Sequence, residues 1–504
     1  MTRCKAGGTQ SAALALGLVL AMPAAAADSA LPSPGGDDVQ IAQFTLPSAR
    51  PAPGAGPPPA PVPQFLEFQY FYTGEIKFTY VNNLDLNYGL TDRDVSTTPL
   101  LTGGVTYRPT AWLETRLDAS IERKYGLKQE KVTILPDAPL GDEPKFRDDR
   151  RNYHLFAEQA YARVKPPGLP VEFTAGRETY ADRRLWLYDA NLDTVHVKFK
   201  PGDFHIDAFT GKENLLDLDA LSRVPHGRID YHAVHAEYRG IEDHQFAAYA
   251  IARRDERALV DPLYTGRPNF YGLRALGRPS DSLNYWADLG FVRGRAGRDP
   301  NPNERGDKIE GFGYDVGATY RFLNLPLQPS ITLGYAFGSG DRNVALNDTT
   351  AKSFMQTGLQ TNEGKFAGVT QFRTYGEFFN PELRNIEIFT VGIGARPAAW
   401  LFTELVFHQY RMDEPVPTEI FSGAQPTAPI NKITNPRRTD TDLGREIDIV
   451  IGLRNLFGIR GFGTDIRAGL FFPGDAYDIE NFNGNGRFFK NADRGVSLIF
   501  LFLI

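Results

Sequence analysis

The chain has 504 residues, a net charge of −6, and a composition that is 42% hydrophobic and 12% aromatic. Its mean hydropathy of −0.33 is too polar for a protein built of membrane-spanning helices, and its acidic balance gives no support to nucleic-acid binding. Composition alone leaves open a soluble all-β protein and a β-barrel.

Residues 1–27 have the parts of a secretory signal peptide. Arg3 and Lys5 form a positive start, the stretch 11–22 is apolar, and small residues follow it. The apolar stretch is shorter than the roughly 20 residues that a spanning helix needs, so we expect cleavage and not an anchor. Cys4 is the only cysteine, and its removal would exclude disulfides, cysteine-ligated metals and a cysteine nucleophile.

Residues 28–66 are rich in proline, alanine and glycine, with ARPAPGAGPPPAPVP at their centre. This composition cannot bury enough apolar surface to fold, and it predicts a disordered, semi-rigid extended linker. A spacer is one interpretation, and a docking segment for a periplasmic partner is the other.

From residue 67 to residue 504 the chain alternates between apolar and polar side chains. In 113–122, leucine, threonine, alanine and isoleucine alternate with Glu114, Arg116, Asp118, Ser120 and Glu122. Side chains alternate across a strand, so each such segment has one apolar and one polar face. Several segments approach the roughly 9–11 residues that a tilted strand needs to cross a bilayer. The pattern recurs at 194–199, 314–322, 331–337, 446–453 and 465–472.

The polar faces of these segments carry charges and glycine together, and tyrosine or phenylalanine often stands at strand ends. A soluble sandwich would instead keep most aromatics in a dry core. Charged faces and terminal aromatics are typical of a barrel in lipid, with a wet lumen and an aromatic girdle at each interface. The C-terminal segment 496–504, VSLIFLFLI, has the length of a closing strand.

Connections between the segments alternate in length. Short ones occur at 108–110 and 396–398, and long polar ones at 128–149, 341–364 and 413–442. Short turns on one side and long loops on the other are expected of an outer-membrane barrel. Roughly 440 residues at about 24 per strand and turn predict about 18 strands. The predicted fold is therefore all-β, a transmembrane antiparallel barrel over residues 67–504.

Seven segments, in order, resemble the alginate export porin family of Gram-negative outer membranes. They are GRETYADRRLWLYDANLDTVHVKF (176–199), LNYWADLGF (283–291), ITLGYAFGSGD (331–341), QTGLQTNEGKFAG (356–368), FRTYGEFFNPELRNI (372–386), LGREIDIVIG (443–452) and RAGLFFPGDAY (467–477). The resemblance implies an 18-stranded outer-membrane barrel, narrowed by loops and lined by an arginine-rich constriction, that exports an acidic polysaccharide. The implied partners are that polysaccharide, outer-membrane lipid and periplasmic polysaccharide-synthesis or export proteins, with a monomeric barrel.

A polyuronate carries one carboxylate per sugar, so its passage calls for cations that attract without trapping. Arginine suits this because its planar guanidinium group binds a carboxylate through two hydrogen bonds and stays charged. Arg467 is the first candidate, since strand parity turns it into the lumen and it matches a family arginine. Arg373 is the second, and we expect it to share one face of a strand with Tyr375 and Glu377.

Further candidates come from the segment 176–199. Arg177 matches the family, but it has the parity of Phe173 and faces inward only if the strand bulges or ends there. Arg183, Arg184 and Asp193 match the family's constriction region.

Arg116 and Arg321 face the lumen by parity alone. For every candidate, the structural alternative is a wall residue in a salt-bridge ladder.

No nucleophile elbow, phosphate loop or zinc-protease motif occurs, so we expect no catalytic residue, no metal and no cofactor. The leading hypothesis is a passive channel that exports an anionic polysaccharide. Its alternatives are a porin for small anionic solutes or other oligosaccharides, an outer-membrane barrel enzyme, and a soluble β-sandwich adhesin.

Overall fold

A computed structural model describes residues 67–83, 93–127, 153–213, 215, 219–221, 229–255, 266–295, 308–342, 350–415, 440–480, 488–490 and 494–503. The predicted signal peptide 1–27, the linker 28–66 and most of the long connections 128–149 and 413–442 lie outside these residues. Among the described residues, no helix is long and apolar enough to span a membrane.

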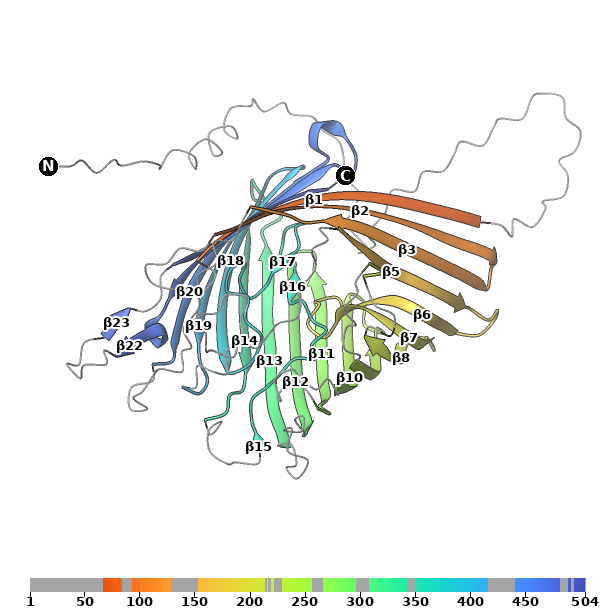
Figure 1. The fold of residues 1–504 in the computed structure, drawn as a ribbon, viewed down its shortest axis with the longest axis horizontal. Helices are drawn as coiled ribbons and strands as arrows, with labels where there is room; N and C mark the ends of the chain where they lie inside the picture. Colours follow the sequence, from red (N-terminus) through yellow and green to blue (C-terminus); the bar gives the residue numbers. More distant parts are fainter. Residues whose placement is uncertain are drawn as a thin grey trace, which may run out of the picture. The chain divides into compact units, whose positions relative to one another are not determined.

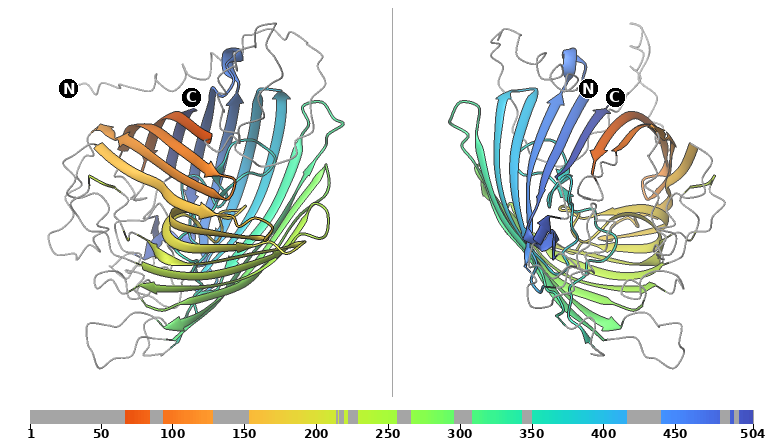
Figure 2. Two further views of the ribbon diagram at one scale, coloured as in Figure 1. Left: turned by 90° about the vertical axis from the view of Figure 1, so that its right-hand side faces the viewer. Right: turned by 60° about the vertical axis from the view of Figure 1, so that its left-hand side comes forward.

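The strands form one sheet that closes on itself. It holds 20 strands, of which β4 (Tyr125–Leu127) and β15 (Thr350–Ala351) are short additions, leaving 18 long ones within the described residues. Each long strand pairs antiparallel with its neighbours in chain order, as Figures 1 and 2 show. Closure comes from β1 (Glu67–Asn82) and β24 (Gly495–Leu503), which pair from Glu75↔Leu503 to Asn82↔Val496. The prediction of about 18 strands is confirmed.

The remaining long strands have the following bounds: β2 (Arg93–Thr110), β3 (Leu113–Arg123), β5 (Tyr153–Val164), β6 (Val171–Ala181), β7 (Asp189–Phe199), β8 (Phe204–Glu213), β9 (Ile229–Tyr238), β10 (His244–Asp255), β11 (Asn269–Ser280), β12 (Leu283–Arg295), β13 (Lys308–Arg321), β14 (Ser330–Gly338), β18 (Ile386–Ala398), β19 (Leu401–Arg411), β20 (Asp442–Arg454) and β21 (Gly463–Pro473).

The alternation of exposure matches the alternation of sequence. In β3, Leu117 and Ile121 are exposed, whereas Asp118 and Ser120 are buried. In β20, the exposed isoleucines likewise alternate with buried acidic residues. A charged face that is buried inside a closed sheet excludes the two-layer sandwich, because a sandwich would bury its apolar faces.

The connections differ in length at the two ends of the barrel. Short turns lie at 111–112 and 399–400, just after the predicted positions 108–110 and 396–398, which instead form the ends of β2 and β18 at a register shift. Exposed aromatic side chains gather at this short-turn end, as predicted for an interface girdle. They are Trp112, Phe199, Phe204, Tyr238, Tyr320, Trp400 and Phe457.

The connection between β14 and β18 is more than an outer loop. Its residues 352–385, here called the inner loop, carry β16 (Glu363–Gly364) and β17 (Phe372–Arg373) and contact inward-facing side chains of the barrel. The expectation that 341–364 is a long polar outer loop is therefore wrong for its second part, which is largely buried.

The inner loop and the loop 182–188 bring aromatic side chains into the lumen. The rings of Trp186 and Phe354 lie 6.2 Å apart, and those of Phe379 and Phe471 stack at 4.6 Å. The lumen is thus partly dry, although the sequence pattern predicted a wet, charged interior. Alternation along the strands predicts only which strand side chains face the lumen. The apolar side chains inside the barrel also come from the loops that cover the wall, which alternation does not describe.

Inward-facing glycines allow this close contact. A Cβ added at Gly311 would lie 2.6 Å from the Cα of Phe354, and one at Gly469 would lie 2.8 Å from the amide nitrogen of Phe378. Any larger residue at either position would push the inner loop away from the wall.

Candidate functional site: charged residues of the lumen

Asp182 holds the loop 182–188 in place. Its carboxylate accepts hydrogen bonds from the backbone amides of Leu187 (2.8 Å), Tyr188 (3.0 Å) and Arg184 (3.1 Å), and from Nη1 of Arg274 (2.6 Å). Burial opposes ionisation, but Arg274 and the two amides of Tyr188 and Leu187 outweigh it and lower the pKa of Asp182. The loop is therefore tied to β11 through an ionised carboxylate.

Arg184 lies inside the barrel, as predicted, with its guanidinium engaged by two acids. Nη1 lies 2.8 Å from Asp288 and Nη2 lies 2.8 Å from Asp315, while the guanidinium stands 4.7 Å from the centre of the Trp286 ring. The hydroxyl of Tyr375 also donates to Asp315, at 2.8 Å. This network joins the loop 182–188, the wall and the inner loop.

Arg183 contacts a residue of another strand. Its Nη1 lies 3.5 Å from Oε1 of Gln245, on β10.

Arg177 and Asp193 form a bidentate ion pair. Nε donates to Oδ1 at 2.9 Å and Nη2 to Oδ2 at 2.7 Å, and both residues are buried. Gly176 precedes Arg177 and has a φ of +122°, which belongs to a region that favours glycine. Phe173 stays exposed on the outer face. The pairing of β6 with β5 and β7 shows no register shift, so Arg177 keeps the parity of Phe173 and the bulge that would turn it inward is not found in this strand.

A second group of charges lies where the inner loop meets β1 and β21. Lys77 interacts electrostatically with Arg373 and Arg467, and these three residues are here called the basic cluster. Nη1 of Arg467 lies 3.6 Å from both Glu363 and Glu377 and donates to the backbone oxygen of Gln371 at 3.2 Å.

Arg373 does not share a strand face with Tyr375 and Glu377, which corrects the sequence prediction. Only residues 372–373 are extended, and the chain then turns. Nη1 of Arg373 donates to the backbone oxygen of Glu377 at 3.1 Å, and the backbone amide of Arg373 donates to the carboxylate of Glu377 at 3.1 Å. Burial raises the pKa of Glu377 despite the attraction of Arg467 and Arg373.

Two acids on β20 hold the inner loop against the wall. Glu446 accepts hydrogen bonds from the amides of Phe378 (2.6 Å) and Phe379 (2.9 Å), and Asp448 accepts one from the amide of Glu377 (3.2 Å). The hydroxyl of Tyr410 donates to Glu446 at 3.2 Å. The carboxylates replace water as partners of a turn that is buried inside the barrel.

Arg116 and Arg321 face inward, as parity predicted, but stand apart from the basic cluster. Arg116 pairs with Asp118 at 2.8 Å and lies 5.3 Å from the Phe71 ring centre. Arg321 ends β13 at the short-turn end, within electrostatic range of Arg278 and Asp281.

Sequence reasoning missed Lys77 and Arg274. The alternation of side chains marks both residues as inward-facing, since Lys77 precedes the outward-facing Phe78 and Arg274 follows the outward-facing Leu273. Neither lies in a segment that resembles the family. Within the described residues no group of three or more metal-binding side chains occurs.

An 18-stranded antiparallel barrel with an apolar outer face, charged inner wall and internal loops defines a porin-type barrel of the outer membrane. The chain belongs to the alginate export family, whose model matches residues 66–488. Family and fold together point to a transporter.

Two relatives carry the name alginate production protein AlgE. The one from Azotobacter vinelandii is 28% identical over 184 residues, which cover 34% of this chain and 36% of that protein. The one from Pseudomonas syringae pv. tomato is 25% identical over 255 residues, covering 43% and 48%. The chain thus spans less than half the length of these relatives.

Among solved structures, OpdQ of Pseudomonas aeruginosa aligns with a TM-score of 0.50 at 10% identity, over 86% of this chain and 98% of that one. This likeness shows the fold alone.

Proposed function

We propose that the barrel is a passive channel that exports an anionic polysaccharide of the alginate type, with the basic cluster as its main contact for carboxylates. The family and the name of its two relatives support the substrate class. The proposed transport has no chemical step. The barrel would act as a monomer in lipid and receive the polymer from periplasmic proteins of polysaccharide synthesis or export.

The observation that carries the proposal is a difference between two sets of ion pairs. Arg184 and Arg177 are held by carboxylates at 2.7–2.8 Å, a distance typical of strong charge-assisted hydrogen bonds. Arg467 meets its two glutamates only at 3.6 Å. Loose pairs can exchange one carboxylate for another, whereas tight buried pairs build the wall.

The arrangement of the basic cluster suits brief contact with a moving polymer. Its cations come from β1, the inner loop and β21, and Glu75, Glu363 and Glu377 lie among them. These glutamates compete with the polymer for the cations, so each sugar carboxylate would be attracted and then released. In this proposal Arg116, Arg183, Arg184 and Arg321 line the path, and the Arg177–Asp193 pair maintains the shape of its wall.

Single-channel recording in planar bilayers tests the proposal. The variants are Lys77→Gln, Arg373→Gln and the two together, and the control is Arg293→Gln, an exposed arginine on the outer face of β12. We expect anion preference and block by polyuronate oligomers to weaken several-fold in the double variant and to stay unchanged in the control. Unchanged selectivity in the double variant would overturn the assignment of the cluster.

A length series of oligomers separates export of a polymer from passage of small anions. A polysaccharide channel should show block that deepens with polyuronate length and is absent with neutral oligosaccharides. Equal passage of a monomeric uronate without any block by longer chains would favour the small-solute porin.

A further inference from the structure

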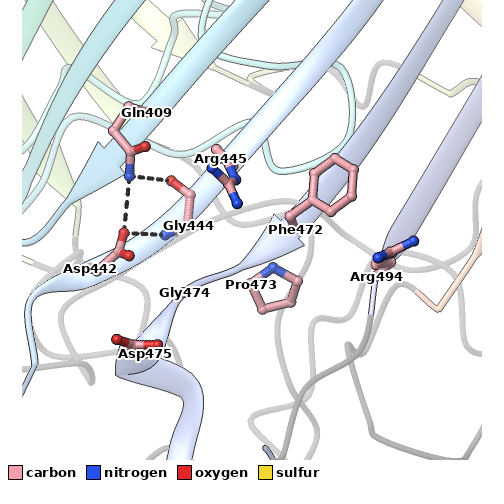
Figure 3. A pocket seen from close by; sticks show the side chains of 9 residues that line it. All are labelled: Gln409, Asp442, Gly444, Arg445, Phe472, Pro473, Gly474, Asp475 and Arg494. Atoms are coloured by element: carbon pink, nitrogen blue, oxygen red, sulfur yellow. Dashed lines mark hydrogen bonds between the residues drawn. The ribbon is translucent and has the colours of Figure 1, made fainter.

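A cavity of about 550 Å³ lies at the long-loop end of β19, β20 and β21. Figure 3 shows its lining side chains, with Gln409, Arg445 and Phe472 on adjacent strands and Arg494 just before β24. Nothing in the proposed transport uses this cavity, because it is on the other side of the wall.

Register and exposure place the cavity on the outer face of the barrel. Gln409 pairs with Arg445, and Arg445 pairs with Phe472, so the three side chains point to the same side. Arg445 is exposed and shares its parity with the exposed Ile447 and Ile449 of β20. The acids Glu446 and Asp448, which hold the inner loop, point the opposite way.

The surface changes character at this level of the barrel. The residues on the same face nearer the middle of the strands are apolar and exposed, namely Leu405, Ile447 and Ile449. The row Gln409, Arg445, Phe472 is followed by the connections 412–441 and 474–494. In a barrel with long outer loops, this level corresponds to the head groups of the outer leaflet.

Two arginines supply the positive charge of the cavity. Arg445 is exposed, and the guanidinium of Arg494 lies 5.1 Å from the centre of the Phe472 ring. Of the two acids, Asp442 is engaged, because it accepts hydrogen bonds from Nε2 of Gln409 and from the amide of Gly444, each at 3.0 Å. Asp475 is exposed at the edge of the cavity.

We propose that this cavity binds the phosphorylated head group of an outer-leaflet glycolipid. Arg445 and Arg494 would hold the phosphate, because the planar guanidinium matches phosphate geometry in a bidentate manner. The amide of Gln409 and the free edge of Asp442 would meet sugar hydroxyl groups. The acyl chains would lie along the apolar strip formed by Leu405, Ile447 and Ile449.

Native mass spectrometry of the full barrel tests this site, with lipid A and its dephosphorylated form as the two probes. We expect the wild-type protein to retain lipid A about tenfold more strongly than the dephosphorylated form, since charge-assisted hydrogen bonds to phosphate are among the strong ones. Equal retention of the two probes would overturn the proposal without any variant being made.

The variants Arg445→Gln, Arg494→Gln and their combination locate the phosphate. The double variant should bind both probes equally, whereas Arg293→Gln, an exposed outward arginine beside Phe291, should keep the wild-type preference. A preference for lipid A that survives in both single variants and in the double variant would also overturn the proposal. These measurements read lipid binding, so they do not depend on the transport activity proposed above.

Discussion

Asp182 and Arg274 form a buried ion pair, with 2.6 Å between Oδ2 and Nη1, that joins the loop 182–188 to strand β11. The same carboxylate accepts the amides of the loop, so one side chain both shapes the loop and fixes it to the wall. Arg274 in turn binds Asp288, a partner of Arg184. The loop and the wall are therefore parts of one polar network.

The first prediction concerns Asp182→Asn. The amide group of asparagine would face Nη1 of Arg274 and the amide of Arg184 with a donor where an acceptor stood, and Arg274 would keep only its pair with Asp288. A buried donor that loses its acceptor costs about 1–3 kcal/mol, and we expect a lower midpoint of thermal unfolding and faster hydrogen exchange at Leu187 and Tyr188. The control is Asp243→Asn, which removes an exposed pair with Arg278, and should cost under about 1 kcal/mol. Equal effects of the two variants would contradict the anchoring role.

The second prediction concerns acidic pH. The pKa of Asp182 is lowered in the folded protein, so its contribution to stability is present above the usual aspartate pKa of about 3.9 and is lost as pH falls through the lowered value. Hydrogen exchange at Leu187 and Tyr188 should stay slow from pH 7 down to the usual aspartate range and rise only below it. Release of the loop between about pH 5 and 6 would show that another group controls it.

The third prediction concerns Glu446→Gln. Glutamine offers one carbonyl oxygen, so only one of the amides of Phe378 and Phe379 keeps its acceptor and the other faces an NH₂ group. The inner loop should loosen, and single-channel conductance should rise. The matched control is Glu387→Gln, on the outer face of β18. A conductance that does not change would mean that packing of the aromatic rings alone retains the loop.

The fourth prediction concerns Gly176→Ala. Its φ of +122° disfavours any residue with a Cβ, and that Cβ would lie 2.2 Å from the backbone oxygen of Ala160. Strain of this kind costs about 1–3 kcal/mol, and it would displace the Arg177–Asp193 pair. Thermal unfolding measures the loss. Gly126→Ala serves as control because a Cβ there meets nothing within 4 Å, and similar midpoints for the two variants would refute the argument.

Much of the barrel follows from local alternation. Arg467, Arg116 and Arg321 were placed on the inner wall by parity, and the structure confirms all three orientations. Parity works because a strand turns every second side chain to the same side, whatever its neighbours are. For Arg177 parity gives the side of Phe173, and only the structure shows its buried ion pair with Asp193.

The positions of Arg184 and Arg373 could not be obtained in this way. Both lie in irregular segments, and their places depend on partners distant in sequence, such as Asp315 for Arg184 and the Glu446 anchor for the inner loop. No periodic pattern encodes a hydrogen bond between a loop amide and a carboxylate on a far strand.

By itself the sequence determined the closed antiparallel barrel, its approximate number of strands and the side to which each wall residue points, because these follow from a repeat of two residues and from connection lengths. Only the tertiary structure decided which cations are held at 2.7–2.8 Å and which are held loosely at 3.6 Å, and that loop residues 352–385 turn inward. The reason is physical: charge pairing inside a barrel is set by distances across the lumen, and neighbours across the lumen are far apart along the chain.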